Sequence, residues 1–221
     1  MKSTTSLIAL TTVLLAWSAK VNAADQSLPR NLSAEEVGAA GKPVGWGHYE
    51  NTPDAWGVTD KESHTGRRCA FLRVVGFGEE DDATTGMAVG ETDGYTAPSG
   101  ISVKPNTRCH FSFYLAGYGF KRSIKVSPWG FKADGSGRDR DFAEVSVLPT
   151  AAWKRYTGTF TTKANTRRVV LMFFVYGLHD RDVDEGATFY VDDVYLGTSE
   201  PPPPIAATGR AQVVVPESAP A

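Results

Sequence analysis

The segment TFYVDDVYLG, Thr188 to Gly197, combines the residue types of a β-strand with two adjacent carboxylates. β-Branched and aromatic residues favour strands, whereas Asp is depleted in them. Successive strand side chains point to opposite faces, so Asp192 shares a face with Tyr190 and Asp193 lies on the other. Both faces are otherwise mostly apolar. The segment therefore predicts a strand with two carboxylates that need a compensating partner.

Other strand-like segments recur along the chain, and Gly, Pro, Asn and Asp separate them. No stretch sustains a helical period. Short strands with regular turn signals predict an all-β fold, a β-sandwich of the jelly-roll type. The segments are CAFLRVVGF (69–77), GISV (100–103), CHFSFYL (109–115), SIKVSPWGF (123–131), RYTGTFTT (155–162) and RRVVLMFFVYG (167–177).

The first residues have the pattern of a secretory signal peptide. Lys2 gives a positive start, Leu7 to Trp17 is mostly apolar, and Val21 to Ala23 fits a small-residue cleavage site. The apolar run is too short to span a bilayer, and no later run is long enough. We therefore expect residues 1–23 to be removed and the protein to be exported, to the periplasm or outside the cell.

The far end differs in composition from the rest of the chain. Pro201 to Pro204 is a proline run, followed by small residues. We expect 199–221 to form a stiff, then disordered, tail, or alternatively a tether or short motif for surface proteins. Residues 24–198 are enough for one domain with a core of its own.

The charge balance argues against nucleic acid as a partner. The formal net charge is −2, and the expected signal peptide removes two of the 23 basic residues and none of the 25 acidic ones. Binding to phosphates needs a basic surface. The mature chain is therefore more acidic than the whole, which excludes that class and favours no other.

Cys69 and Cys109 are the only two cysteines, each near the start of a predicted strand. In an exported protein two cysteines pair more often than they stay free, so we expect a disulfide between them. The alternative is two buried thiols that never meet.

Five motifs, in order, resemble those of the CenC-like carbohydrate-binding modules, the cellulose- and xylan-binding type with a galactose-binding-like jelly roll. Together they cover nearly the whole expected domain. They are NLSAEEVGAAGKPVGWGHYE (31–50), HTGRRCAFLRV (64–74), ISVKPNTRCHFSFYL (101–115), AAWKRYTGTFTT (151–162) and TFYVDDVYLG (188–197). The resemblance implies an exported module that binds poly- or oligosaccharide and has no catalytic activity.

The resemblance also implies a structural Ca²⁺ ion between the first and last strands. Glu35 takes the place of the opening acid and Asp192 that of the closing acid. Backbone carbonyls near Thr65 and Arg67 would complete the shell. Hard oxygen ligands suit Ca²⁺, and a cation would remove the penalty of a buried carboxylate.

One departure leaves the ligand choice open. Ala34 stands where the family has an aromatic residue, so Glu36 could replace Glu35 as the opening ligand. Asp193 could likewise replace Asp192. Without an ion, salt bridges to Arg67 or Arg68, or an edge strand facing water, would explain the carboxylates.

Sugar binding needs flat aromatic rings against sugar faces and polar groups at sugar edges. Tyr114 points opposite Phe113 on its strand, Tyr118 follows in the Gly-rich LAGYGF, and Trp129 follows a proline in SPWGF. These three positions are our first candidates for rings available to a ligand.

Two further candidates lie in segments expected to be loops, where recognition is concentrated. Trp56 lies in the turn-like NTPDAWGV, and Tyr95 lies in a long loop expected over residues 78–99. Ordinary packing is the competing explanation for every one of these rings. The nearby polar partners that we expect are Lys125, Arg138 and Asp139.

Nothing in the sequence marks an enzyme. The acidic runs GEEDD (78–82), GRDRD (137–141) and LHDRDVDEG (178–186) are typical of solvated loops, and the histidines lack metal-ligand spacing. We therefore expect no catalytic residues. The alternatives are a cell-surface or assembly domain without a sugar ligand, and a small polysaccharide-active enzyme, such as a glycoside hydrolase or lyase.

Overall fold

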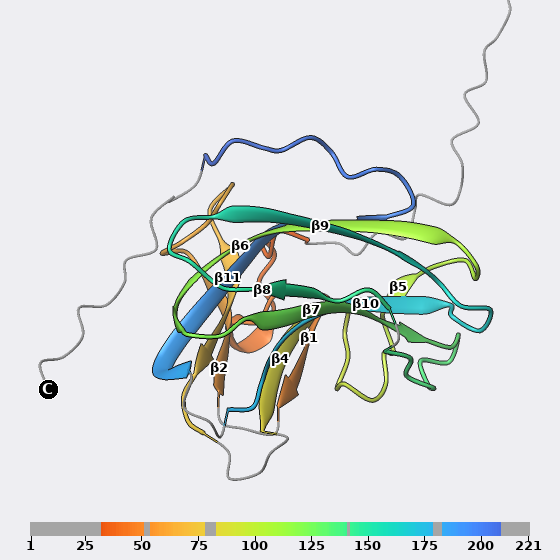
Figure 1. The fold of residues 1–221 in the computed structure, drawn as a ribbon, viewed down its shortest axis with the longest axis horizontal. Coiled ribbons are helices and arrows are strands. Elements are labelled where there is room, and N and C mark those ends of the chain that lie inside the picture. Colours follow the sequence, from red (N-terminus) through yellow and green to blue (C-terminus); the bar gives the residue numbers. More distant parts are fainter. Residues whose placement is uncertain (1–31, 51–53, 78–82, 141, 179–182, 209–221) are drawn as a thin grey trace, which may run out of the picture.

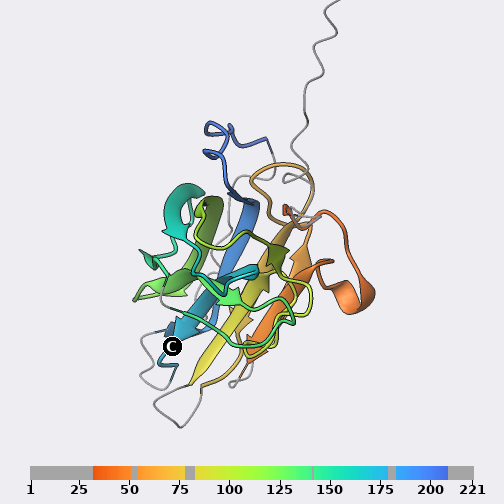
Figure 2. The same cartoon turned by 90° about the vertical axis from the view of Figure 1, so that its right-hand side faces the viewer.

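The computed structural model describes residues 32–50, 54–77, 83–140, 142–178 and 183–208. Within these residues the chain forms two antiparallel β-sheets packed face to face (Figures 1 and 2). This confirms the predicted all-β jelly-roll sandwich. The predicted signal peptide, residues 1–23, lies outside the described residues.

One layer is a five-stranded sheet in the order β2-β3-β11-β6-β9. The other is a six-stranded sheet in the order β1-β4-β10-β7-β8, with β5 also paired to β10. Every pairing is antiparallel. The strands are β1 (Trp46–Glu50), β2 (Asp54–Thr59), β3 (Cys69–Val74), β4 (Thr84–Val89), β5 (Ile101–Ser102), β6 (Arg108–Phe120), β7 (Ile124–Phe131), β8 (Val145–Val147), β9 (Lys154–Thr161), β10 (Arg168–Tyr176) and β11 (Val183–Gly197).

The main core lies between the two sheets and contains Phe111, Phe173 and Phe189, all fully buried. Strand β10 is apolar on both faces for a reason visible in the packing. Phe173 points into the main core, whereas Phe174 belongs to a second apolar cluster with Trp129 on the outer face of the six-stranded sheet. A strand covered on both sides reads as a continuous apolar run rather than an alternating one.

Four strands were not predicted, and β4 is the most informative. It lies inside the loop expected over residues 78–99, and its sequence TTGMAV contains Gly86. A Cβ at Gly86 would lie 2.7 Å from the carbonyl oxygen of Phe173 and 2.8 Å from Cβ of Phe174. Close packing against β10 therefore requires glycine here, although glycine weakens strand propensity.

The predicted disulfide is wrong: both cysteines are buried free thiols. Cys69 belongs to a small cluster with Tyr190 on the outer face of the five-stranded sheet, whereas Cys109 packs in the main core. Their strands, β3 and β6, are separated by β11. Two strand spacings amount to about 9–10 Å, which exceeds the reach of a disulfide.

The tail predicted from Ser199 onward is not unpacked, as far as the structure describes it. The Tyr114 hydroxyl accepts a hydrogen bond from the backbone N–H of Ile205 at 2.8 Å and donates one to its carbonyl oxygen at 3.1 Å. The backbone N–H of Thr208 donates to the His64 carbonyl at 3.0 Å. The tail therefore runs along the outer face of the five-stranded sheet (Figure 1).

Among the described residues, no helix is long and apolar enough to cross a membrane.

Candidate functional site

A continuous row of aromatic rings crosses the outer face of the six-stranded sheet. Tyr95 meets Tyr49 edge-on at 6.1 Å between ring centres, and Tyr49 meets Trp129 at 6.5 Å. Trp129 lies 5.7 Å from Phe174, which meets Tyr176 edge-on at 4.4 Å. We call these five residues the aromatic strip.

Side chains alternate between the two faces of a strand, and this alternation puts the residues of the strip on the outer face of the sheet. Trp129 on β7 is opposite Val170 on β10, and both belong to the outer apolar cluster. Phe174 and Tyr176 follow Val170 at even spacings along β10, so all three share the outer face. Tyr49 comes from β1, at the far side of β4. The strip is therefore assembled across the width of the sheet.

Tyr95 is carried by a turn whose backbone is held by many contacts. The Asp93 carboxylate accepts hydrogen bonds from the backbone N–H groups of Tyr95 at 2.8 Å and Thr96 at 2.6 Å. These N–H donors lower the pKa of Asp93. Gly94 adopts φ +85°, and a Cβ there would lie 2.2 Å from the Tyr49 ring. The left-handed conformation and the close approach both require glycine.

Two arginines lie against the strip. The guanidinium carbon of Arg138 lies 4.8 Å from the ring centre of Tyr95 and 5.1 Å from that of Trp129. The guanidinium carbon of Arg140 lies 5.7 Å from the Trp129 ring centre. Arginine over an aromatic face is a favourable cation–π contact. Arg138 also donates a hydrogen bond to the Gly94 carbonyl oxygen, which ties it to the turn.

The two ends of the strip are exposed to solvent, and its middle is buried. Tyr95 is 62% exposed and Tyr176 is 40% exposed, whereas Trp129 is only 3% exposed. Burial raises the pKa of Tyr176, and the charge of the neighbouring Arg140 opposes that shift. The rings that a ligand can touch are therefore the two tyrosines, and Trp129 supports them from beneath.

The five aromatic residues selected from the sequence are thus divided between sites. The structure brings Trp129 and Tyr95 together, with Arg138 as the expected polar partner. Trp56, Tyr114 and Tyr118 lie elsewhere, on strands of the five-stranded sheet. Sequence analysis missed the strip residues Tyr49, Phe174, Tyr176 and Arg140. Phe174 and the inward Phe173 both lie in apolar clusters, so the sequence alone does not separate them.

Trp56 is on β2 rather than in the turn that was expected. Its ring stacks on His48 at 4.9 Å between ring centres, and the Lys42 amino group lies 4.2 Å from its centre. It also packs against the main core. The side chain is therefore engaged by its own neighbours.

Tyr114 and Tyr118 lie on β6, at different places on the outer face of the five-stranded sheet. Tyr114 is buried under the tail and stacks on His64 at 3.6 Å between ring centres. Tyr118 lines a pocket of about 540 Å³ together with Phe71 and Tyr190. That pocket holds no member of the aromatic strip.

The two carboxylates of β11 meet the loop that precedes β3. Asp192 is 0% exposed. Its Oδ2 accepts hydrogen bonds from the backbone N–H groups of His64 at 2.8 Å and Thr65 at 3.1 Å. Asp193 has φ +46°, and its Oδ1 accepts from the Thr65 hydroxyl at 2.6 Å while Oδ2 lies 2.7 Å from His64 Nδ1. Hydrogen bonds thus engage both carboxyl groups.

Glu35 reaches the same loop from the other side. Its Oε1 accepts hydrogen bonds from the backbone N–H groups of Arg67 at 2.8 Å and Arg68 at 3.2 Å. The expected ligands Glu35, Thr65, Arg67 and Asp192 therefore converge, but through amide donors rather than carbonyl oxygens. N–H groups do not ligate cations, so the contacts that these residues make in the structure supply no carbonyl ligand for Ca²⁺.

Burial sets the protonation of Asp192. Desolvation, followed by the neighbouring Asp193 charge, raises the pKa of Asp192 to about 8, although three backbone N–H donors act in the opposite direction. A carboxyl group that is protonated at neutral pH avoids the cost of a buried charge. The same group would ionise if a cation were bound beside it.

Neither a family model nor a curated protein sequence matches the chain. Solved structures do resemble it in fold. A structure titled "CBM4 structure and function" is 17% identical, with a TM-score of 0.50 over 78% of this chain and 100% of that one. The MgGH51 α-L-arabinofuranosidase is 14% identical, with a TM-score of 0.53 over 77% of this chain and 26% of that one.

The tailspike protein 4 of bacteriophage CBA120 is 10% identical, with a TM-score of 0.54 over 76% of this chain and 22% of that one. The chain therefore spans only about a quarter of the length of the arabinofuranosidase and of the tailspike protein. At such low identity the likeness concerns the fold. The chain has the β-sandwich fold of carbohydrate-binding modules, as the resemblance implied. Its CenC-like subtype stays a prediction.

Proposed function

We propose that this is an exported, non-catalytic carbohydrate-binding domain, and that the aromatic strip is its ligand-binding surface. The observation that carries the proposal is the continuous row of rings from Tyr95 to Tyr176 across the outer face of one sheet. Rings at the two ends are exposed, and guanidinium groups lie beside them. The fold shared with carbohydrate-binding modules supports the same conclusion.

The chemistry of the strip suits a polymer of sugar rings. Exposed tyrosine faces can stack against the C–H faces of sugar units, and guanidinium groups can donate to hydroxyl oxygens at the sugar edges. Two exposed rings separated by a buried tryptophan would contact different sugar units of one chain. A poly- or oligosaccharide is therefore a better match than a single sugar.

The charges beside the strip support binding rather than hydrolysis. Glycosidases place two carboxyl groups on either side of the scissile bond. Here the described groups that contact the strip from its edge are Arg138 and Arg140. The Glu144 carboxylate near Tyr176 is occupied by Lys125 at 2.6 Å. Among the described residues at the strip, this charge pattern offers no acid–base pair for glycoside cleavage.

The proposal is tested by affinity electrophoresis of the full chain through gels that contain xylan, mixed-linkage β-glucan, galactan or an acidic polysaccharide. Retardation in at least one gel, without release of reducing sugar, is the expected result. Tyr176→Ala should weaken the retardation, whereas Tyr118→Ala on β6 of the other sheet should not. A folded chain that is retarded by none of these polymers would overturn the proposal in favour of an assembly domain.

We also propose the structural calcium ion that the resemblance implies. Its support is that Glu35 and Asp192 approach one short loop from two sides, and that Asp192 is buried with a raised pKa. Added CaCl2 should raise the unfolding temperature above that in EDTA. Glu35→Gln should remove this difference and Glu36→Gln should retain it. Equal unfolding temperatures for the unmodified protein would mean that the amide contacts alone compensate the carboxylates.

A further inference from the structure

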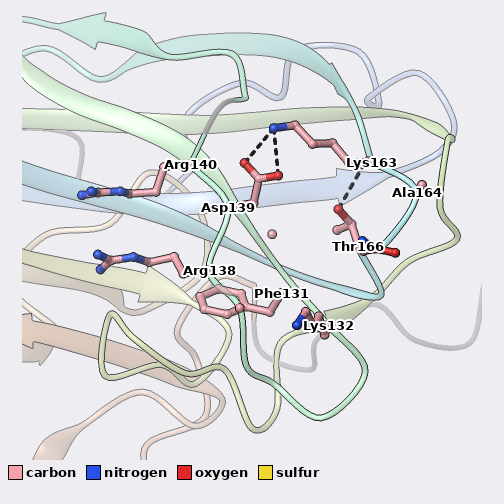
Figure 3. A pocket seen from close by; sticks show the side chains of 11 residues that line it. Phe131, Lys132, Arg138, Asp139, Arg140, Lys163, Ala164 and Thr166 are labelled. Atoms are coloured by element: carbon pink, nitrogen blue, oxygen red, sulfur yellow. Dashed lines mark hydrogen bonds and ion pairs between the residues drawn. The ribbon is translucent and has the colours of Figure 1, made fainter.

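Two arginines are held side by side on the outer face of the six-stranded sheet. Gly130 of β7 and Asp139 form an antiparallel bridge, with both N–H to carbonyl hydrogen bonds at 2.8 Å. In such a bridge the residues that flank one partner share a face with those that flank the other. Arg138 and Arg140 therefore lie on the same face as Trp129. Figure 3 shows both side chains extending to one side and Asp139 to the other.

Because neighbouring side chains point to opposite sides, the ion pair of Asp139 lies on one side of this segment and the two arginines lie on the other. Asp139 accepts a hydrogen bond from the Lys163 amino group, with N···O distances of 2.9 and 3.0 Å (Figure 3). Asp139 and Lys163 line a pocket of about 520 Å³ (Figure 3). Among the described residues that line it, Asp139 is the only acid, and the cations are Lys132, Arg138, Arg140 and Lys163. Asp139 is paired with Lys163, and both arginines extend away from it to the rings of the strip, so this acid does not neutralise them.

Other described acids near the strip are already engaged. Glu144 pairs with Lys125 at 2.6 Å, and Asp93 accepts hydrogen bonds from the N–H groups of its own turn. The chain as a whole carries a formal net charge of −2, so two arginines on one aromatic ring do not reflect a generally basic surface. Two guanidinium groups on one tryptophan ring repel each other, and an anion between or beside them would offset that repulsion.

We propose that Arg138 and Arg140 bind the carboxylate of a uronic acid unit in an acidic polysaccharide. This inference rests on the proposed function and narrows its substrate class. The planar guanidinium matches a carboxylate with two parallel hydrogen bonds, which gives orientation as well as charge. Since Arg138 contacts both Tyr95 and Trp129, a sugar stacked on Tyr95 would bring its carboxylate to the arginine pair.

Isothermal titration and affinity electrophoresis of the full chain would test this with polygalacturonate and alginate, each compared with its esterified form. Esterification keeps the backbone and removes the charge. We expect at least one acidic form to bind roughly tenfold more tightly than its ester, with a preference that falls as salt rises. Arg140→Gln should reduce that ratio about fivefold or more, whereas Arg108→Gln on β6, with the same change of charge, should not.

The outcomes separate this inference from the proposed function. Binding to neutral xylan or β-glucan with no preference for either acidic form would overturn the inference and leave glycan binding intact. A preference for dextran sulfate over dextran that exceeds any preference for the carboxylate polymers would overturn the carboxylate assignment. Failure to bind any polysaccharide would overturn both. Circular dichroism of each variant shows whether it is folded.

Discussion

The guanidinium carbon of Arg138 lies 4.8 Å from the ring centre of Tyr95, and its side chain donates a hydrogen bond to the carbonyl oxygen of Gly94. The arginine therefore connects β7 and its following loop to the turn that presents the most exposed aromatic ring of the strip. Any ligand that stacks on Tyr95 must meet this charge.

Replacing Tyr95 by alanine tests the strip directly. Because the ring is 62% exposed, its loss should leave unfolding nearly unchanged. Binding to the polysaccharide found by the gel screen should weaken by about 1–2 kcal/mol, or roughly five- to thirtyfold. Tyr118→Ala is the comparison, because Tyr118 lines the pocket on the other sheet. If Tyr118→Ala weakens binding and Tyr95→Ala does not, the ligand lies on the five-stranded sheet.

Trp129→Ala should act mainly on stability. The side chain is buried in the outer apolar cluster with Val170 and Phe174, so its removal leaves a cavity. We expect a loss of about 3–5 kcal/mol in the free energy of unfolding, measured with urea. Trp129→Phe should cost less because part of the ring volume remains. A midpoint unchanged by the alanine substitution would show that the ring contributes little to packing.

The buried Asp192 predicts a dependence of stability on pH. Its pKa is raised to about 8 in the folded chain and is about 3.9 in an unfolded one. The folded state therefore holds more protons between these values, and stability decreases as pH rises from about 4 to about 8. The slope from this group is at most about 1.4 kcal/mol per pH unit.

Urea unfolding at a series of pH values in EDTA measures this slope, and Asp192→Asn is the control. The substitution should lower stability at every pH because an amide replaces one acceptor, and the slope should become flatter. Carboxyl titration by NMR gives the pKa independently. A value near 4 in the folded protein would contradict the prediction.

The thiols should behave as two isolated buried groups. Burial, followed by the charges of Asp192 and Glu62, raises the pKa of Cys69, and burial raises that of Cys109. A protonated, buried thiol reacts slowly. We expect two thiols to react with a thiol reagent after unfolding and almost none before it, and reductant to leave the unfolding temperature unchanged. A peptide that joins both cysteines in non-reducing mass mapping would disprove this.

Tyr114→Phe should release the tail from the five-stranded sheet. The substitution removes both hydrogen bonds to Ile205 at a cost of about 1 kcal/mol. Hydrogen exchange at the Ile205 amide should become faster. Tyr156→Phe, on the neighbouring strand β9, removes a hydroxyl without touching the tail and should leave that rate unchanged. Equal protection in both variants would show that other contacts hold the segment.

The sandwich was predictable because most of its strands are long apolar segments bounded by turn residues. Strand β4 was missed because its Gly86 is required by close contact with β10, which a single sequence does not display. The cysteines were misassigned because a single sequence does not show that β11 lies between β3 and β6 in the sheet. Register and strand order are properties of the whole fold.

The candidate site was predictable only in part. Trp129, Tyr95 and Arg138 were selected as separate positions, because local sequence shows that each follows a turn or lies in an expected loop. Their meeting depends on the pairing of β7 with β10 and on the Gly130–Asp139 bridge. Phe174 was missed because both faces of β10 are apolar, so its alternation carried no polar contrast.

The turn that carries Tyr95 has a consequence for the thermodynamics of recognition. The Asp93 carboxylate and the close contact between Gly94 and Tyr49 fix its backbone without a ligand. The conformational entropy of the turn is therefore lost during folding rather than during binding. Ordering the Tyr95 side chain alone would cost about 0.5–1.5 kcal/mol. A preorganised surface of this kind keeps more of its contact energy as affinity, and it docks as a nearly rigid body.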